Sequence, residues 1–240
     1  MQDHLTEKAL EFIDNQASND GPFFLYLPFA APHTPWLPGE NFEGKSDAGT
    51  YGDFVHHVDH SVGLLLNKLD ELNLSEETLV IFTSDNGAHW TNDDKALFEH
   101  RANHIFRGQK ADIYEGGHRV PYIARWKGRI QANTQSDALL CSTDLMATIA
   151  GMLDQDLPEG AGEDSYNLWG HYVNDLSIGT KRDHVIHHSL HGHFAIRKGK
   201  WKAFLSLFLF FSSNLIHVHQ AAACLLPGTC MGIGANILSK

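Results

Sequence analysis

Cysteine is scarce in this 240-residue chain, which contains only Cys141, Cys224 and Cys230. Their spacing matches no zinc-binding pattern, and an odd number of cysteines cannot close a framework of disulfides. The sequence therefore gives no sign of a zinc ribbon or a disulfide-stabilised scaffold. It leaves the redox compartment of the protein undecided.

Basic residues are also few, since 18 Lys and Arg stand against 29 Asp and Glu and give a formal net charge of −11. Nucleic acids and anionic membrane surfaces attract basic proteins. We therefore expect neither a nucleic acid nor a membrane as a partner. An anionic substrate would need a locally basic pocket within this acidic chain.

Long apolar runs are absent, because the longest one, residues 204–211, has only eight residues. A membrane-spanning helix needs about twenty. This run has little charge and no alternation, so it is an aggregation hazard unless it is buried. The N-terminal residues also lack the basic and apolar segments of a signal peptide. A complete chain would therefore be cytoplasmic, whereas a fragment would say nothing about compartment.

The patterned segments that are present predict an α/β fold. Apolar residues recur at helical spacing over residues 6–16, with Thr6 as the expected cap, and again over 54–72 and 143–153. Apolar runs typical of strands, β-branched or aromatic, occur at 23–27, 78–82 and 120–126. The first two strands and the helix between them predict a right-handed parallel crossover, which brings both strand ends to one edge of the sheet.

A change of pattern after about residue 177 predicts a smaller antiparallel unit. Short strands are expected at 185–186, 194–197 and 200–202, the last two joined by a tight turn at Lys198-Gly199. We therefore divide the chain into residues 1–177, residues 178–203 and a divergent apolar tail at 204–240.

A polar segment, Thr83 to Trp90, follows the second predicted strand. Side chains just past the carboxyl end of a strand line the ligand crevice of an open α/β sheet, which offers Asp85 and Asn86 to a ligand. Two hard oxygen donors suit Ca²⁺ or Mg²⁺. The alternative is that Asp-Asn-Gly is only turn chemistry. His56 and His60 have zinc-like spacing but lack a third ligand, so we expect a solvated helix face.

A long polar loop over residues 91–118 contains Lys110. Loops of this length are uncommon inside a compact domain unless they are functional. Near its end, Glu115 and Arg119 are expected to pair with each other or to cap the loop rather than to touch a substrate.

The ordered segments from about residue 4 to 202 resemble the sulfatases of the alkaline-phosphatase-like superfamily, and the arylsulfatase type most closely. The segments that carry the resemblance are Pro22–Tyr26 with Pro32–Pro35, Tyr51–Phe54, Thr78–Gly87, Gly108–Lys110 with Glu115–Gly117, and Phe194–Lys202. Each is weak alone, and their common order makes the resemblance specific. It implies a mixed sheet flanked by helices, here as a partial domain, followed by the start of an antiparallel subdomain.

The resemblance also implies roles for particular residues. Asp85 and Asn86 would ligate a divalent cation, usually Ca²⁺ with Mg²⁺ as the alternative, and Lys110 and His33 would contact the sulfate group. His89, Trp90, His104 and Arg107 are candidates for the pocket wall, and we select His89 and Arg107 as substrate-binding residues. The implied substrate is a small-molecule or carbohydrate sulfate ester.

Several family features are missing from this sequence. The family nucleophile is a formylglycine made in a Cys/Ser-x-Pro-x-Arg motif, which occurs nowhere here. The early Asp-Asp pair of the metal site and an early Lys and His are also absent. We therefore expect the later part of a catalytic domain, inactive alone and holding its cation weakly, with a tail that arises from a gene-model error or is lineage-specific.

Two other functions remain open at this point. One is a phosphatase or phosphodiesterase of the same superfamily, and the other is a non-catalytic module that binds sulfated glycans. Family members are usually periplasmic, secreted or lysosomal, so the resemblance and the N-terminal sequence leave the localisation unknown.

Overall fold

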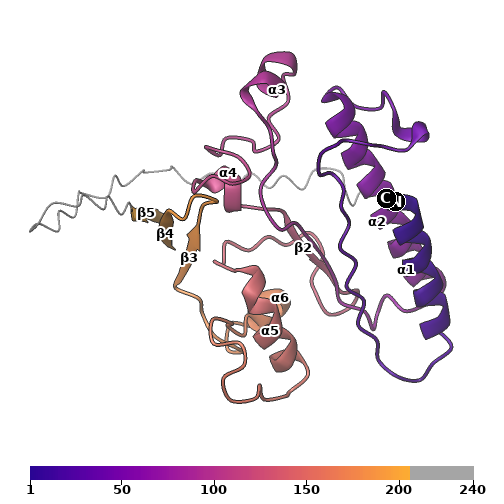
Figure 1. Cartoon of the computed structure of the whole chain (residues 1–240). Helices are drawn as coiled ribbons and strands as arrows, with labels where there is room; N and C mark the ends of the chain where they lie inside the picture. Colours follow the sequence, from indigo (N-terminus) through magenta and orange to yellow (C-terminus); the bar gives the residue numbers. More distant parts are fainter. Residues whose placement is uncertain (206–240) are drawn as a thin grey trace, which may run out of the picture.

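The computed structural model describes residues 1–205 (Figure 1). Its helices are α1 (Gln2–Gln16), η1 (Glu40–Phe42), α2 (Gly49–Glu71), α3 (Asn92–Leu97), α4 (Glu115–His118), η2 (Ser142–Asp144), α5 (Leu145–Met152) and α6 (Trp169–Val173). Its strands are β1 (Val80–Thr83), β2 (Tyr122–Arg125), β3 (His184–His188), β4 (Phe194–Lys198) and β5 (Trp201–Leu205). The expected apolar tail lies outside the described residues from residue 206 on.

Helices α1 and α2 pack side by side at one end of the molecule (Figure 1). Ala9 and Ile13 of α1 are each only 2 % exposed, as their helical spacing predicts. The predicted start of α1 is wrong: the helix begins at Gln2, and the Thr6 hydroxyl donates to the Gln2 carbonyl instead of capping the helix. The Gln2 side-chain amide donates to the hydroxyl of Ser61, which joins the two helices.

The first sheet differs from the predicted one. Strands β1 and β2 pair antiparallel, with Val80 opposite Arg125 and Thr83 opposite Tyr122, and both are only partly buried. The parallel crossover is therefore wrong within the described residues. The predicted buried strand at 23–27 is wrong too, because no described strand pairs with this segment and Phe24 and Tyr26 are 73 % and 76 % exposed. An apolar run identifies an extended segment, but a neighbouring strand is needed to make it part of a sheet.

The second sheet confirms the predicted antiparallel hairpin. It has the order β3-β4-β5, with every neighbouring pair antiparallel. Lys198 pairs with Trp201, so the two-residue turn is Gly199-Lys200, one residue later than predicted. Gly199 has a φ of +55°, which a glycine adopts at low cost at this turn position.

A buried ion pair joins the residue before α5, the helix predicted at 143–153, to the segment that leads into β3 of this sheet. Asp144 stands directly before α5 and is 3 % exposed, while Arg182 precedes β3 and is 8 % exposed. The Arg182 Nε donates to Asp144 Oδ2 at 2.9 Å, and the Cys141 and Tyr166 amides donate to the same carboxylate. Across residues 1–205, no helix combines the length and the apolar character that crossing a bilayer requires.

Candidate functional site

The loop that follows β1 places the predicted metal ligands at the surface. Asp85 is exposed and Asn86 is half-buried, so both side chains are accessible to an ion. The Ser84 hydroxyl donates to the Asn86 carbonyl at 3.1 Å, and the Gly87 amide donates to the Gly117 carbonyl at 3.0 Å. This last bond fixes the loop to α4.

Gly87 is the tightest point of this loop. A Cβ atom there would lie 1.8 Å from the carbonyl oxygen of Gly116. Real Cβ atoms essentially never approach an oxygen this closely, so only glycine lets the two backbones meet. The Asp-Asn-Gly sequence therefore does more than turn the chain, because its glycine sets the distance between two loops.

A second set of backbone bonds brings Lys110 to the same place. The Lys110 amide donates to the Ala88 carbonyl at 3.1 Å. The Asn103 side chain accepts from the Ala88 amide at 3.0 Å and donates to the Ala88 carbonyl at 2.9 Å. Ala88 thus links the loop of Asp85 and Asn86 to the long loop of Lys110. Asp85 and Lys110 are 25 residues apart in the chain, and the sequence suggested that they lie together only through the family resemblance.

Arg107 lies on the same long loop with an exposed side chain. Its guanidinium stands 3.7 Å from the centre of the Tyr114 ring, and its carbonyl accepts from the Gly116 amide at 2.8 Å. A cation over an aromatic face is attracted to the electron-rich ring, which orients the Arg107 side chain. The backbone of Arg107 is therefore held by the segment that also holds Gly87.

The loop that carries His33 reaches this region through a cluster of aromatic rings. Its ring Nδ1 lies 2.6 Å from the Thr34 carbonyl oxygen, and its side chain is exposed. Three residues on, the Trp36 ring lies 6.3 Å from that of Trp90, which is 1 % exposed. His89 precedes Trp90 and is exposed. The cluster brings the His33 loop against the 88–90 segment, and no described hydrogen bond or ion pair joins His33 or His89 to Lys110.

His57 is a structural residue that the sequence analysis missed. It is 1 % exposed, its Nδ1 accepts from the Gly39 amide at 3.1 Å, and its Nε2 lies 2.6 Å from Asp3 Oδ1. Since Nδ1 accepts, Nε2 carries the proton and donates to Asp3. The neighbouring His56 and His60 are exposed as predicted. Only the inward helical position of His57, between Phe54 and Val58, distinguishes it in the sequence.

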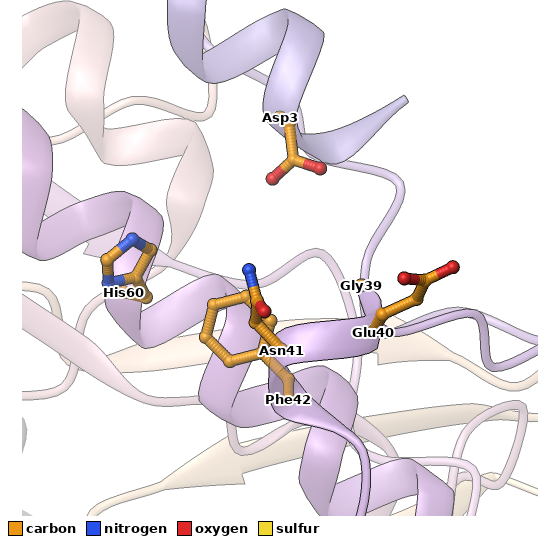
Figure 2. A pocket seen from close by; sticks show the side chains of 6 residues that line it. All are labelled: Asp3, Gly39, Glu40, Asn41, Phe42 and His60. Carbon is orange, nitrogen blue, oxygen red and sulfur yellow. The ribbon is translucent and has the colours of Figure 1, made fainter.

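An open hollow of about 530 Å³ lies beside His57, away from the predicted site residues. Figure 2 shows the residues around it, which come from α1, from η1 with the residue before it, and from α2: Asp3, Gly39, Glu40, Asn41, Phe42 and His60. None of these belongs to the metal or sulfate residues predicted from the sequence. We therefore place the candidate site at the loops around Ala88, where the backbone contacts converge, and not at this hollow.

Glu115 has more partners than the sequence predicted. Arg119 lies 3.9 Å from its Oε2, which agrees with the expected pair. However, Lys202 donates to its Oε1 at 3.1 Å and Arg197 donates to its Oε2. Burial by itself would raise the pKa of Glu115, but Arg197 and Lys202 outweigh burial and the pKa is lowered. The carboxylate is therefore ionised at neutral pH.

Two histidines pack next to this cluster. The His118 and His187 rings have centroids 4.2 Å apart, and neither Nε2 has a hydrogen-bond partner among the described residues. Burial lowers the pKa of both rings, that of His187 to about 4, and the nearby Lys202 charge lowers both pKa values further. Both rings are therefore neutral at pH 7.

Asp85 and Asn86 fit a hard divalent cation in donor type but supply few ligands. Carboxylate and amide oxygens are the donors that Ca²⁺ prefers, and it takes six to eight of them. Residues 1–205 contain no group of three or more His, Cys, Asp or Glu side chains that could hold a metal ion. The candidate site thus offers Asp85 and Asn86 as side-chain oxygen donors, fewer than a Ca²⁺ ion takes.

Comparison with known proteins identifies relatives of this chain. The family profile described as Sulfatase matches residues 1–155. An N-acetylgalactosamine-6-O-sulfatase of Bacteroides thetaiotaomicron is 39 % identical over 83 % of this chain and 39 % of its own length. The human steryl-sulfatase is 34 % identical over 97 % of this chain and 40 % of its own length. The chain thus spans about two fifths of the length of these relatives.

Solved structures agree with this match. A sulfatase structure from the glycosaminoglycan metabolism of Bacteroides thetaiotaomicron has a TM-score of 0.77 and 35 % identity, over 85 % of this chain and 43 % of that one. The PsFucS1 sulfatase from Pseudoalteromonas sp. has a TM-score of 0.74 and 29 % identity, over 85 % of this chain and 40 % of that one. The mixed α/β arrangement with small antiparallel sheets is therefore part of a known architecture, and the chain belongs to the sulfatase family.

Proposed function

We propose that this chain forms part of a sulfuric ester hydrolase, which releases inorganic sulfate from an aryl or carbohydrate sulfate ester. One observation carries the proposal: the backbone bond from Lys110 to Ala88 brings a lysine next to a loop with two hard oxygen donors. The Lys110 ammonium would supply the local positive charge that an anionic substrate needs in a chain of net charge −11. Membership of the sulfatase family supports the same reaction class.

Each proposed residue has a role that sulfate-ester cleavage requires. Asp85 and Asn86 would hold Ca²⁺, or Mg²⁺, which when bound supplies a Lewis acid that stabilises charge on the sulfate oxygens. Lys110 would place a fixed ammonium beside the same oxygens. His33 would donate a proton to the departing alcohol oxygen.

His89 and Arg107 would line the substrate pocket next to these residues. Both side chains are exposed, and both belong to segments that backbone bonds hold at Ala88 or Gly116. Arg107 is already oriented by the Tyr114 ring, so little side-chain freedom is lost when it contacts a sulfate or a sugar hydroxyl.

The same residues leave the nucleophile to be supplied from elsewhere. The printed sequence contains no Cys/Ser-x-Pro-x-Arg motif in which a formylglycine could be made. We propose that residues 1–240 alone bind a sulfate ester but do not turn it over. A chain without the nucleophile keeps the residues that would bind the sulfate ester but lacks the group that attacks sulfur.

Binding and turnover of 4-nitrophenyl sulfate by the purified chain test this proposal. We expect no release of 4-nitrophenol, and we expect binding in the presence of Ca²⁺ that is lost in Lys110→Ala. The matched control is Lys95→Ala, which removes an exposed lysine from α3. Equal binding by Lys110→Ala and the unaltered chain would contradict the site, and turnover that persists after further purification would contradict the missing nucleophile. Tighter binding of 4-nitrophenyl phosphate than of the sulfate would favour the phosphatase class.

A further inference from the structure

We propose that Glu115 is a positioning residue, which holds the loop of Asp85 and Asn86 in place by linking it to the sheet of β4 and β5. The inference rests on the proposed function, because that function gives the loop its metal-binding role. Glu115 itself touches neither the proposed ion nor the substrate. It would act through the backbone of the two glycines that follow it.

The side chain of Glu115 is anchored in the second sheet. It is 9 % exposed, and its partners Arg197 on β4 and Lys202 on β5 lie 82 and 87 residues further along the chain. Lys202 is itself only 8 % exposed. Hydrogen bonds between ionised groups are stronger than neutral ones, and a buried ammonium without its partner is costly. The carboxylate therefore fixes α4 against the sheet.

The backbone next to Glu115 is anchored in the site. The Gly116 amide donates to the Arg107 carbonyl, and the Gly117 carbonyl accepts from the Gly87 amide. A Cβ atom on Gly116 would lie 2.3 Å from the Gly108 carbonyl oxygen, so this contact has no spare room. A movement of α4 therefore displaces both loops that carry the site.

Helix α4 cannot hold this position by itself. It has four residues, too few for a helix to be stable without tertiary contacts. The glycine contacts hold it on one side, and on the other the Glu115 carboxylate and the packing of His118 against His187 hold it to the second sheet. Removing the charge of Glu115 weakens this second attachment and leaves Lys202 buried without its carboxylate.

An exposed ion pair elsewhere on the same sheet provides a contrast. Asp183 accepts from Lys198 at 3.0 Å and lies against His184, and its side chain is 55 % exposed. Its partners belong to the same sheet, and it makes no described contact with α4. Loss of the Asp183 charge should therefore leave the position of the loop of Asp85 and Asn86 unchanged.

Amide hydrogen exchange measured by NMR on the whole chain tests the proposal without any metal. We compare Glu115→Gln, which keeps the size of the side chain and removes its charge, with the control Asp183→Asn. We expect exchange at the Gly87 and Gly116 amides to become at least about tenfold faster in Glu115→Gln, equivalent to about 1.4 kcal/mol. Amides in the middle of α2 should keep their rates, and Asp183→Asn should change none of them.

Two results would overturn the positioning role. One is an unchanged rate at both glycine amides, and the other is an equal acceleration at these amides and in α2, which means only a general loss of stability. Should Glu115→Gln fail to fold, Arg197→Gln, which leaves the Lys202 contact, decides by the same criteria. Calcium titration of the unaltered chain separates the two proposals: a lack of response at Asp85 removes the metal role but leaves the exchange result standing.

Discussion

Replacement of Gly87 by alanine tests how closely the loop of Asp85 and Asn86 approaches α4. The added Cβ atom would lie 1.8 Å from the Gly116 carbonyl oxygen and 3.2 Å from the Gly117 Cα. The two backbones must separate, which also breaks the bond from the Gly87 amide to the Gly117 carbonyl. Both neighbours are backbone atoms, so no side chain can rotate to make room.

The size of the effect follows from two contributions. Inserting a methyl group into a filled space costs about 1–3 kcal/mol. Loss of one backbone hydrogen bond adds about 0.5–1.5 kcal/mol. We therefore expect Gly87→Ala to lower the free energy of unfolding by about 1.5–4.5 kcal/mol, as the sum of these contributions.

Urea unfolding followed by circular dichroism measures this change. The matched control is Gly63→Ala on α2, where a Cβ atom meets nothing within 4 Å. Alanine is the better helix former, so Gly63→Ala should raise the free energy of unfolding by about 0.5–1 kcal/mol. A Gly87→Ala protein as stable as the unaltered chain would refute the close approach of the two loops.

Two further predictions concern buried charge and protonation. Asp144→Ala leaves Arg182 buried without its carboxylate and should cost about 3–5 kcal/mol in urea unfolding. Asp183→Ala, at an exposed pair, should leave the midpoint of urea unfolding nearly unchanged, and equal losses in the two variants would contradict the role of the buried ion pair. Burial, with help from the nearby Lys202 charge, lowers the pKa of His187 to about 4 from an ordinary 6.5. As the pH drops from about 6.5 to about 4, the unfolded chain therefore takes up a proton that the folded chain does not, and the free energy of unfolding should fall over this range. Replacing His187 by phenylalanine should make the free energy of unfolding depend less on pH in this range. An unchanged pH dependence in that variant would contradict the conclusion that His187 is buried and neutral beside His118.

The helical parts of the fold were predictable from local patterns. Apolar residues of α2 recur every three or four positions, and this spacing indicated its inward face, including Val58 and Leu69. The hairpin of β4 and β5 was predictable because a glycine in a two-residue turn is a local signal. Both features depend on residues close together in the chain.

Long-range features were beyond the sequence patterns. The run Phe23 to Leu27 has strand composition, but composition does not say which strand lies beside it, and here no described strand does. The partners of Glu115 lie more than 80 residues away, so only the nearby Arg119 was predicted. The residues of the candidate site came from the resemblance, and the structure adds the backbone bonds at Ala88 that bring the two loops together.

Calcium titration followed by amide NMR tests the candidate metal site most directly. We predict that the amide signals of Asp85, Asn86 and Gly87 shift, with a dissociation constant near the millimolar range that an incomplete shell of oxygen ligands allows, about 10⁻⁴–10⁻³ M or weaker. Asp85→Asn should abolish these shifts, while Asp93→Asn, an acidic residue on the exposed α3, should preserve them. Stoichiometric binding at micromolar Ca²⁺, or shifts confined to other parts of the chain, would contradict the proposed site.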